Sequence, residues 1–320
     1  MYSPLTSEIT LVAWRVKGLV SSDLEKGKDR KKTVITINVN RKLVELVTLL
    51  SEQYSKSTGA DPAEFYFDYY LNIRPHLNHL YTIGTALGFS KEQHILELGS
   101  GLGTKCILGS GVWQAHFTGL EPCLNTYTAL REAIAEIKRI NSHLPYEAIA
   151  TAGEDTTLPS DSFDFVISSE VLEHVENPER VIQEIYRVLK PGGRWALSTC
   201  NYQSFYEGHY RCLWMPFLSK RSGKHWARML GRNPAFVDEI NFITRRNLVL
   251  YLERAGFSSI VQDPTYPAQR PPDISVEYPE GVICRKWGPT FLQRLVQEAP
   301  IHNMLRRFAL EYKLYFLVQK

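Results

Sequence analysis

The feature that most constrains the fold is an alternation of short apolar runs with helical segments, which begins near residue 94. The apolar runs cover residues 94–98, 116–121, 146–151, 163–168 and 194–199. Helical periodicity separates them, most clearly over 125–141 and 178–189. Strands that alternate with helices in this way form parallel βαβ units with helices on both faces of the sheet. The sequence therefore predicts an α/β fold with a doubly wound, mostly parallel sheet.

This alternation stops after residue 199 and resumes late in the chain. We expect a helix over 244–255, closed by Gly256, and a strand over 258–261. The apolar run 309–319 is expected to complete seven strands as an edge strand of the same sheet. The two interruptions, at about 201–240 and 264–305, are predicted to be insertions, and the second reads as irregular and proline-rich up to about residue 301.

Residues 1–90 are expected to form an N-terminal cap region that precedes the sheet domain at 91–320. Residues 8–20 and 32–40 look strand-like, and the polar stretch 21–32 between them reads as a loop. Apolar residues at helical spacing from Leu43 to Leu50 predict a helix that breaks near 57–61. Pro62 opens an aromatic helical region that continues to about Leu87 and is interrupted before Pro75.

Composition narrows the functional classes. Apolar residues make up 44% and charged residues 22%, which excludes a disordered or coiled-coil chain. The net charge is only +3, so we expect no nucleic-acid partner bound by the whole surface. The five cysteines form no CxxC pair, which predicts free thiols and no structural zinc site. Neither a signal peptide nor an apolar stretch long enough to span a membrane is visible, so a cytoplasmic protein is expected.

A glycine-rich turn follows the first predicted strand of the sheet domain. Its glycines stand at positions 99, 101 and 103, two residues after Glu97. A dinucleotide fingerprint would need its third glycine where Thr104 stands, which disfavours a nicotinamide cofactor. A carboxylate beside the turn repels a pyrophosphate and suits a ligand with an ammonium group. The alternative is a merely tight turn between strand and helix.

Two acidic positions follow the next strands. Glu121 ends the second predicted strand, where a carboxylate can accept hydrogen bonds from both hydroxyls of a ribose. Glu154 and Asp155 follow the third strand, where they can hold an adenine amino group. Acidic loop residues are usually just solvated, so this second assignment depends on the first.

These segments resemble the class I S-adenosylmethionine-dependent methyltransferases, particularly the ubiquinone/menaquinone methyltransferase-like group. The matching blocks are 97–103, Glu121, 153–155, 158–166, 171–175 and 188–193. The resemblance implies S-adenosyl-L-methionine as cofactor and S-adenosyl-L-homocysteine as product, and we expect methyl transfer without a metal. The family more often has Asp where Glu154 stands, so the adenine contact can shift to Asp155. The implied cofactor-binding residues are Glu97 at the methionine end, Gly99, Ser100, Gly101, Glu121, Pro122, Glu154, Asp155, Ser169 and Glu170.

The candidates for catalysis and substrate binding come from the fourth strand and the first insertion. His174 lies just past the fourth strand and is a candidate base, although the resemblance favours a structural role. His209 or Glu207 is the alternative base, in an insertion that leaves the fifth strand at the ligand edge. Aromatic faces and hydrogen-bonding groups in this insertion suit a sugar or another polyol. The expected substrate contacts are Tyr206, Tyr210, Arg211 and Trp214, and the alternative is a lid packed by its own aromatics.

Basic and aromatic residues alternate further along this insertion, over 211–232. They read either as a solvated amphipathic helix or as an interfacial surface for a carrier-linked substrate, with peripheral contact at the inner face of a membrane. The N-terminal helical region is expected to cap the cofactor pocket with Phe65, Tyr66, Tyr69, Tyr70 and Arg74, although such aromatics more often belong to the core. The leading hypothesis is O-methylation of a polar small molecule such as a sugar or glycan intermediate. The alternatives are C-methylation of a quinone-like or lipid-soluble ring, and a non-catalytic cofactor-binding partner subunit.

Overall fold

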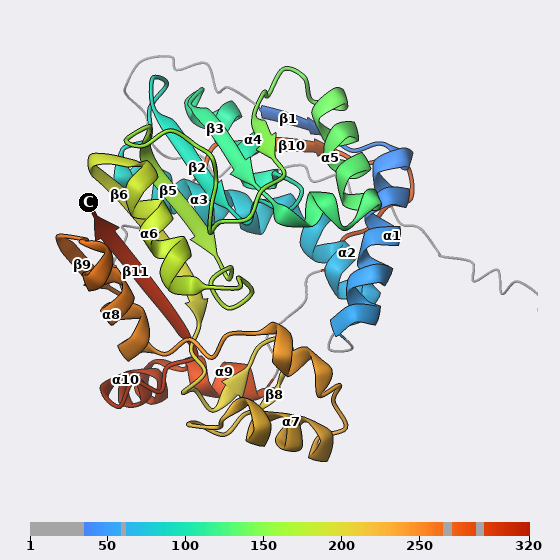
Figure 1. The fold of residues 1–320 in the computed structure, drawn as a ribbon. Helices are drawn as coiled ribbons and strands as arrows, with labels where there is room; N and C mark the ends of the chain where they lie inside the picture. Colours follow the sequence, from blue (N-terminus) through green and yellow to red (C-terminus); the bar gives the residue numbers. More distant parts are fainter. Residues whose placement is uncertain (1–34, 59–61, 265–270, 286–290) are drawn as a thin grey trace, which may run out of the picture.

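A seven-stranded sheet forms the centre of the protein (Figure 1). The computed structural model describes residues 35–58, 62–264, 271–285 and 291–320. The sheet has the strand order β4-β3-β2-β5-β6-β11-β9, and its first five members run parallel. These strands are β2 (His94–Leu98), β3 (His116–Leu120), β4 (Glu147–Ile149), β5 (Phe163–Ser169), β6 (Leu189–Cys200), β9 (Ser259–Gln262) and β11 (Lys313–Gln319). The predicted doubly wound, mostly parallel sheet is confirmed.

The expected position of the last strand is wrong. β11 is not an edge strand, because it lies between β6 and β9 and runs antiparallel to both. Its side chains explain this position: Leu314 and Phe316 are buried in the core on one face, and Leu317 packs against the core on the other. A strand that is apolar on both faces requires neighbours and cover on both sides. The edge is taken by β9, in which Val261 is exposed.

The two faces of the sheet bury alternate residues of each strand against different helices. In β2, Ile95 belongs to the core beneath one helical layer and Leu96 to the core beneath the other. The first layer contains α3 (Ile73–Leu87), α4 (Thr104–Trp113) and α5 (Thr128–Ile140), and the second contains α6 (Pro178–Val188) and α8 (Arg245–Ala255). Glu97 shares the face of Ile95, so its carboxylate lies among the residues of α4.

The N-terminal region consists of β1 (Ile35–Asn38), α1 (Arg41–Thr58), α2 (Ala63–Leu71) and α3. β1 pairs in parallel with β10 (Ile274–Glu277) from the second insertion, so this strand finds its partner within the chain (Figure 1). The expected interruption before Pro75 is confirmed, because α2 ends at Leu71 and α3 begins at Ile73. The strand expected over 8–20, the loop over 21–32 and residues 59–61 of the expected helix break lie outside the described residues.

Both insertions contribute to a third hydrophobic core beyond the end of the sheet. The first contains β7 (Tyr206–Glu207), β8 (Cys212–Leu213) and α7 (Lys220–Met229), and the second contains β10, α9 (Phe291–Gln297) and α10 (Ala299–Arg307). The irregular structure expected over 264–301 is therefore wrong in part. Pro300 does not prevent helix formation, because it lies in the first turn of α10, where a proline needs no hydrogen-bonded N–H. Val296 and Leu305 then bury the two helices in the shared core.

Candidate functional site

A cavity of about 1130 Å³ opens at the carboxyl ends of the parallel strands. Ligands of open α/β sheets bind at this edge, in the crevice outside the strand ends. The volume slightly exceeds that of an ordinary small-molecule site, about 300–1,000 Å³, and leaves room for two ligands. All ten predicted cofactor-binding residues line it: Glu97, Gly99, Ser100, Gly101, Glu121, Pro122, Glu154, Asp155, Ser169 and Glu170.

The glycine turn brings backbone close to the cavity. Gly99 and Gly101 have φ angles of +69° and +53°, in the left-handed region that favours glycine. A Cβ atom at Gly99 would lie 2.5 Å from Cγ2 of Val171, so no larger residue fits without a shift. The N–H groups of Gly99 and Ser100 both donate to the Leu120 carbonyl at 2.9 Å. The turn is thus fixed to the end of β3 and presents backbone rather than side chains to a ligand.

Glu121 connects this turn to the next loop. Its Oε2 accepts the Gly101 N–H at 2.9 Å and its Oε1 accepts the Cys123 N–H at 3.0 Å. The side chain is buried, yet it lines the cavity. An ionised carboxylate has about four acceptor positions, so two remain for a ligand.

Glu97 has a partner that the sequence analysis missed. Lys105, in the first turns of α4, donates from Nζ to Glu97 Oε1 at 3.1 Å and to Ser169 Oγ at 3.3 Å. Burial alone would lower the pKa of Lys105, but the Glu97 carboxylate outweighs it and the pKa is raised. Both charged groups line the cavity. The pair can therefore bind a ligand end that carries both a positive and a negative charge.

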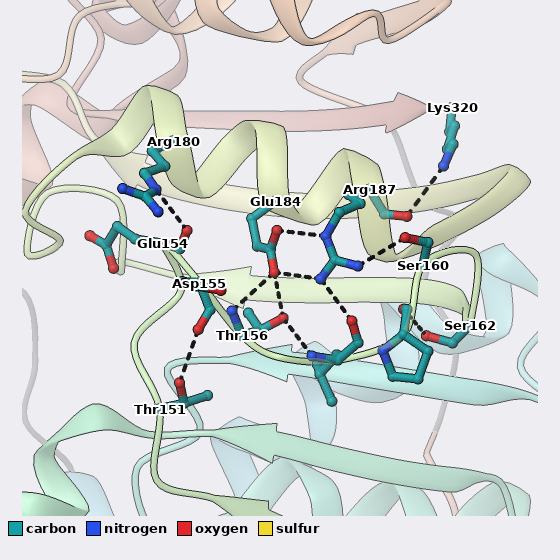
Figure 2. Close-up of polar contacts among 12 residues, drawn as sticks. Thr151, Glu154, Asp155, Thr156, Ser160, Ser162, Arg180, Glu184, Arg187 and Lys320 are labelled. Atoms are coloured by element: carbon teal, nitrogen blue, oxygen red, sulfur yellow. Dashed lines mark hydrogen bonds and ion pairs between the residues drawn. The ribbon is translucent and has the colours of Figure 1, made fainter.

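The two acidic residues after β4 differ in their surroundings (Figure 2). Glu154 Oε1 accepts the backbone N–H groups of Glu176 at 2.8 Å and Asn177 at 3.2 Å, just before α6. Its carbonyl oxygen also accepts from Arg180 Nε at 3.1 Å. The Glu154 carboxylate is thus committed to the protein, which leaves Asp155 as the better placed of the two for a ligand.

A partly exposed ion pair holds the segment that follows Asp155 (Figure 2). Glu184 Oε1 accepts from the N–H and the hydroxyl of Thr156, at 3.0 and 2.7 Å. Arg187 donates to both carboxylate oxygens of Glu184 and to the Leu158 carbonyl. These hydrogen bonds from Arg187, with those from Thr156, lower the pKa of Glu184 to about 2. The loop that carries Asp155 is therefore anchored to α6.

Two histidines meet on the side of the cavity formed by the first insertion. His174 Nε2 and His209 Nε2 lie 3.0 Å apart, and both residues line the cavity. His209 Nδ1 lies 2.7 Å from Oε1 of Glu207, a buried carboxylate that does not line the cavity. Burial would lower the pKa of His209, but Glu207 outweighs it and raises the pKa to about 9. Burial, with the neighbouring His209, lowers the pKa of His174 to about 3.

Two further carboxylates lie next to this pair. Glu170, directly after β5, has a φ angle of +58° and forms an ion pair with Lys313 of β11. Glu173 is fully buried and accepts from Thr199 Oγ1 at 2.8 Å and from the Cys200 N–H at 3.3 Å. Burial raises the pKa of Glu173, and the charge of Glu170 adds to this effect.

The four predicted substrate contacts divide into two groups. Tyr206 and Arg211 line the cavity, and the Arg211 guanidinium lies 5.3 Å from the ring centre of Phe65 in α2. Tyr210 and Trp214 do not line it, because both are fully buried in the core shared by the insertions. The Tyr210 hydroxyl instead donates to the Asn233 carbonyl. These two side chains form the lid's own packing rather than a substrate surface.

The N-terminal helices line part of the cavity. Tyr54 of α1 lines it, as do four aromatic residues of α2: Phe65, Tyr66, Tyr69 and Tyr70. Tyr54 packs against Tyr70 with ring centres 6.1 Å apart and against Tyr127 at 5.0 Å. Hydrophobic and aromatic spacing predicts such residues equally well as core, so only the fold distinguishes the two roles.

Comparisons with known proteins found matches to parts of this chain. A thiol S-methyltransferase of Rattus norvegicus is 38% identical over 108 residues, which cover 33% of this chain and 42% of that protein. An uncharacterised protein of Methanocaldococcus jannaschii is 28% identical over 39% of this chain and 53% of its own length. The chain thus spans about half the length of these curated relatives. A phosphoethanolamine N-methyltransferase structure from Haemonchus contortus has a TM-score of 0.47 at 15% identity and covers 75% of this chain and 52% of that one.

The comparison with protein families covers more of the chain. The profile described as a methyltransferase domain matches residues 44–262, from α1 through β9. This range includes the glycine turn, Glu121, the loop at Asp155 and the histidine pair. Since it contains more than half of the residues, the chain belongs to the methyltransferase-domain family, the class I methyltransferases that use S-adenosylmethionine.

Proposed function

We propose that the protein transfers a methyl group from S-adenosylmethionine to a hydroxyl group of a polar small molecule, such as a sugar or glycan intermediate. One observation carries the proposal. A single cavity joins the glycine turn and Glu121 to the pair His174 and His209. A cofactor and an acceptor can therefore occupy the same cavity.

The residues at the cofactor end fit an adenosyl amino acid. The Ser100 hydroxyl is buried and, among the described residues, has no hydrogen-bond partner. Gly99 and Gly101 line the cavity with backbone alone, because neither carries a side chain. The ion pair of Lys105 and Glu97 matches a group that carries both a carboxylate and an ammonium. The remaining acceptor positions of Glu121 suit ribose hydroxyls, and we assign the adenine end to Asp155.

When bound, S-adenosylmethionine supplies a methyl carbon that is already electrophilic, so the protein must mainly align an acceptor and manage its proton. His174 and His209 face the acceptor part of the cavity, and Glu207 orients His209 from behind through Nδ1. Tyr206 and Arg211 add polar groups to the same region. Aromatic rings of α1 and α2 line the same cavity.

A specific observation favours a second acceptor class. Tyr54, Phe65, Tyr69 and Phe236 line the cavity, and such rings also suit a quinone-like or lipid-soluble ring methylated at carbon. This reading agrees with the resemblance to the ubiquinone/menaquinone methyltransferase-like group. The relatives' names include sulfur, carbon and nitrogen acceptors, so they do not select an atom. A non-catalytic partner subunit is disfavoured by the complete cofactor end.

Methyl transfer from radiolabelled S-adenosylmethionine to acceptor panels tests the proposal. The panels are nucleotide sugars, quinols, thiols and phosphoethanolamine. We expect turnover with a hydroxyl acceptor and a loss of about 10²–10⁴-fold in His174→Ala, the usual contribution of a proton-transferring side chain. Turnover only with quinol ring carbon, thiol or amine acceptors would refute O-methylation. The exposed His225 provides the matched control, His225→Ala.

We also propose that the α7 surface touches an anionic membrane, while the substrate site stays in the cavity. Phe217 is 74% exposed and Met229 70% exposed, beside the exposed Arg221 and Arg228. Apolar side chains flanked by arginines are typical of interfacial segments. No helix in the described part of the chain combines the length and apolar character needed to span a membrane.

Vesicle sedimentation tests the membrane contact. We expect binding to phosphatidylserine vesicles that weakens with salt, because charge attraction is screened. Phe217→Ser should release the protein, whereas Leu250→Ser, at an exposed position of α8, should not. Equal binding of wild type and Phe217→Ser would contradict the proposal.

A further inference from the structure

Three side chains beside the acceptor region have the arrangement of metal ligands. One ligand atom each from Glu173, His174 and His209 can be chosen so that all three lie within 4.8 Å of one another. We infer that these residues bind a divalent first-row transition-metal ion, with open coordination positions for the acceptor. This inference rests on the proposed function for the acceptor, but the metal site can be tested without it.

The distance between the two rings suits two ligands of one ion. Metal–nitrogen bonds of about 2.0–2.1 Å place neighbouring ligand atoms about 2.8–3.0 Å apart in octahedral and about 3.3–3.4 Å apart in tetrahedral geometry. His174 Nε2 and His209 Nε2 are separated by 3.0 Å. Their rings lie nearly perpendicular, at 87°, so the contact is not a stacked pair. An ion between the two nitrogens would replace the direct contact between them.

The surroundings of His209 are those of a metal-binding histidine. Ligating histidines usually donate their second ring N–H to a carboxylate, which fixes the tautomer and the ring direction. Glu207 Oε1 stands 2.7 Å from His209 Nδ1 in that position. Glu207 is itself held by the Tyr202 hydroxyl and the Tyr210 N–H. The carboxylate is therefore fixed before any ion binds.

The third ligand comes from the segment of His174. The Glu173 carboxylate is fully buried, and its hydrogen bonds from Thr199 and the Cys200 N–H use only part of its acceptor capacity. Two imidazoles and one carboxylate form the ligand set typical of zinc and non-haem iron sites with open positions.

Charge balance supports a cation at this place. Glu170, Glu173 and Glu207 bring three carboxylates around the two rings. Lys313 forms an ion pair with Glu170, and His209 forms one with Glu207 when its ring is protonated. Among the described residues Glu173 has no ion pair, and buried carboxylates normally require paired cations or a metal. A divalent ion bound to neutral His209 would balance Glu173 and, in place of the ring proton, Glu207.

The place of the inferred metal ion in the cavity determines its chemical role. His174 and His209 line the cavity, so an acceptor oxygen can reach the open coordination positions. A bound divalent ion lowers the pKa of a hydroxyl that coordinates it. The inferred substrate is therefore an acceptor whose hydroxyl binds the metal. The cysteine count and spacing predicted no structural zinc site, whereas this ligand set contains no cysteine and joins residues 173 and 174 to residue 209.

Calorimetric titration of the chelator-treated full chain with Zn²⁺, Mn²⁺ and Mg²⁺ tests the inference. We expect one transition-metal ion per chain, bound at least tenfold tighter than Mg²⁺, because imidazole ligands disfavour Mg²⁺. His209→Ala should abolish this binding. Glu207→Gln, which keeps all three ligands, should weaken it about 10–100-fold. The matched control His225→Ala should bind as wild type does.

Two readouts keep the outcomes separate. The visible absorption of bound Co²⁺ reports the site in the wild-type protein, without reliance on a variant that fails to fold. Titration of the same samples with S-adenosylhomocysteine reports the cofactor end. No saturable binding of any transition metal, or equal binding in wild type and His209→Ala, would overturn the metal site. Metal binding without binding of S-adenosylhomocysteine would refute the proposed function and leave the metal site standing.

Discussion

Replacement of Glu121 by glutamine tests how the cofactor end is built. The Glu121 carboxylate accepts the Gly101 N–H at 2.9 Å and the Cys123 N–H at 3.0 Å, one on each oxygen. Glutamine preserves the shape but turns one acceptor oxygen into an NH₂ group that faces a backbone donor. The buried donor left without an acceptor should cost about 1–3 kcal/mol of the free energy of unfolding.

Glu121→Gln should also weaken the binding of the cofactor, although it changes only one atom of the side chain from oxygen to nitrogen. A hydrogen bond to a charged group contributes about 1.5–3 kcal/mol, so the loss of one ribose contact raises the dissociation constant about 10–150-fold. Calorimetric titration of Glu121→Gln with S-adenosylhomocysteine, well below its melting temperature, measures this effect. Urea unfolding of the same variant measures the stability.

The control is Glu147→Gln, an exposed carboxylate on β4. It should leave both the dissociation constant and the unfolding free energy unchanged, since exposed substitutions are usually within about 0.5 kcal/mol. A dissociation constant within about twofold of wild type in Glu121→Gln, about 0.4 kcal/mol, would refute the ribose assignment. Glu121 would then only stabilise the fold, through its hydrogen bonds to the backbone of Gly101 and Cys123.

Three further substitutions test other parts of the structure. Gly99→Ala should destabilise the fold by about 1–3 kcal/mol in urea unfolding, because φ is +69° and the new Cβ meets Val171, and Val171→Ala should restore part of the loss. No destabilisation would contradict the tight turn. Trp214→Leu should lower the melting temperature but leave the affinity for S-adenosylhomocysteine unchanged, since Trp214 lies in the insertion core, and a large loss of affinity would contradict that placement. The pKa of Glu184, lowered to about 2 below its usual 4.5, stabilises the fold above about pH 4.5, and this contribution is lost as the pH falls toward 2. Urea unfolding from pH 6 to pH 3 should therefore show a weaker pH dependence in Glu184→Gln, and identical slopes would contradict the ion pair.

The sequence predicted the parts of the site that local chain geometry determines. The glycine turn lies directly after β2, and Glu121 directly after β3, so strand ends and turn residues place both at one edge of the sheet. Every predicted cofactor residue consequently lines the cavity. Lys105 is the first basic residue after the glycine turn in the sequence. Its contact with Glu97 depends on how α4 packs against the sheet, which the sequence does not show.

The remaining features depend on contacts between distant segments. Lys313 reaches Glu170 only because β11 lies next to β6, and the alternating pattern of β11 did not reveal its buried second face. Tyr210 and Trp214 looked like ligand platforms, because a buried aromatic and a ligand-binding aromatic have the same sequence pattern. Helices of the second insertion supply the other half of that core, and no local signal joins the two insertions.

The most direct test of the central claim is a calorimetric titration of the wild-type chain with S-adenosylmethionine, S-adenosylhomocysteine and NAD. We expect one site for the two adenosyl compounds, with mutual competition, and no response to NAD. The Glu97 and Lys105 pair should favour the amino acid end, and the glycine spacing offers no cradle for a pyrophosphate. Binding of NAD, or no binding of either adenosyl compound, would contradict the account.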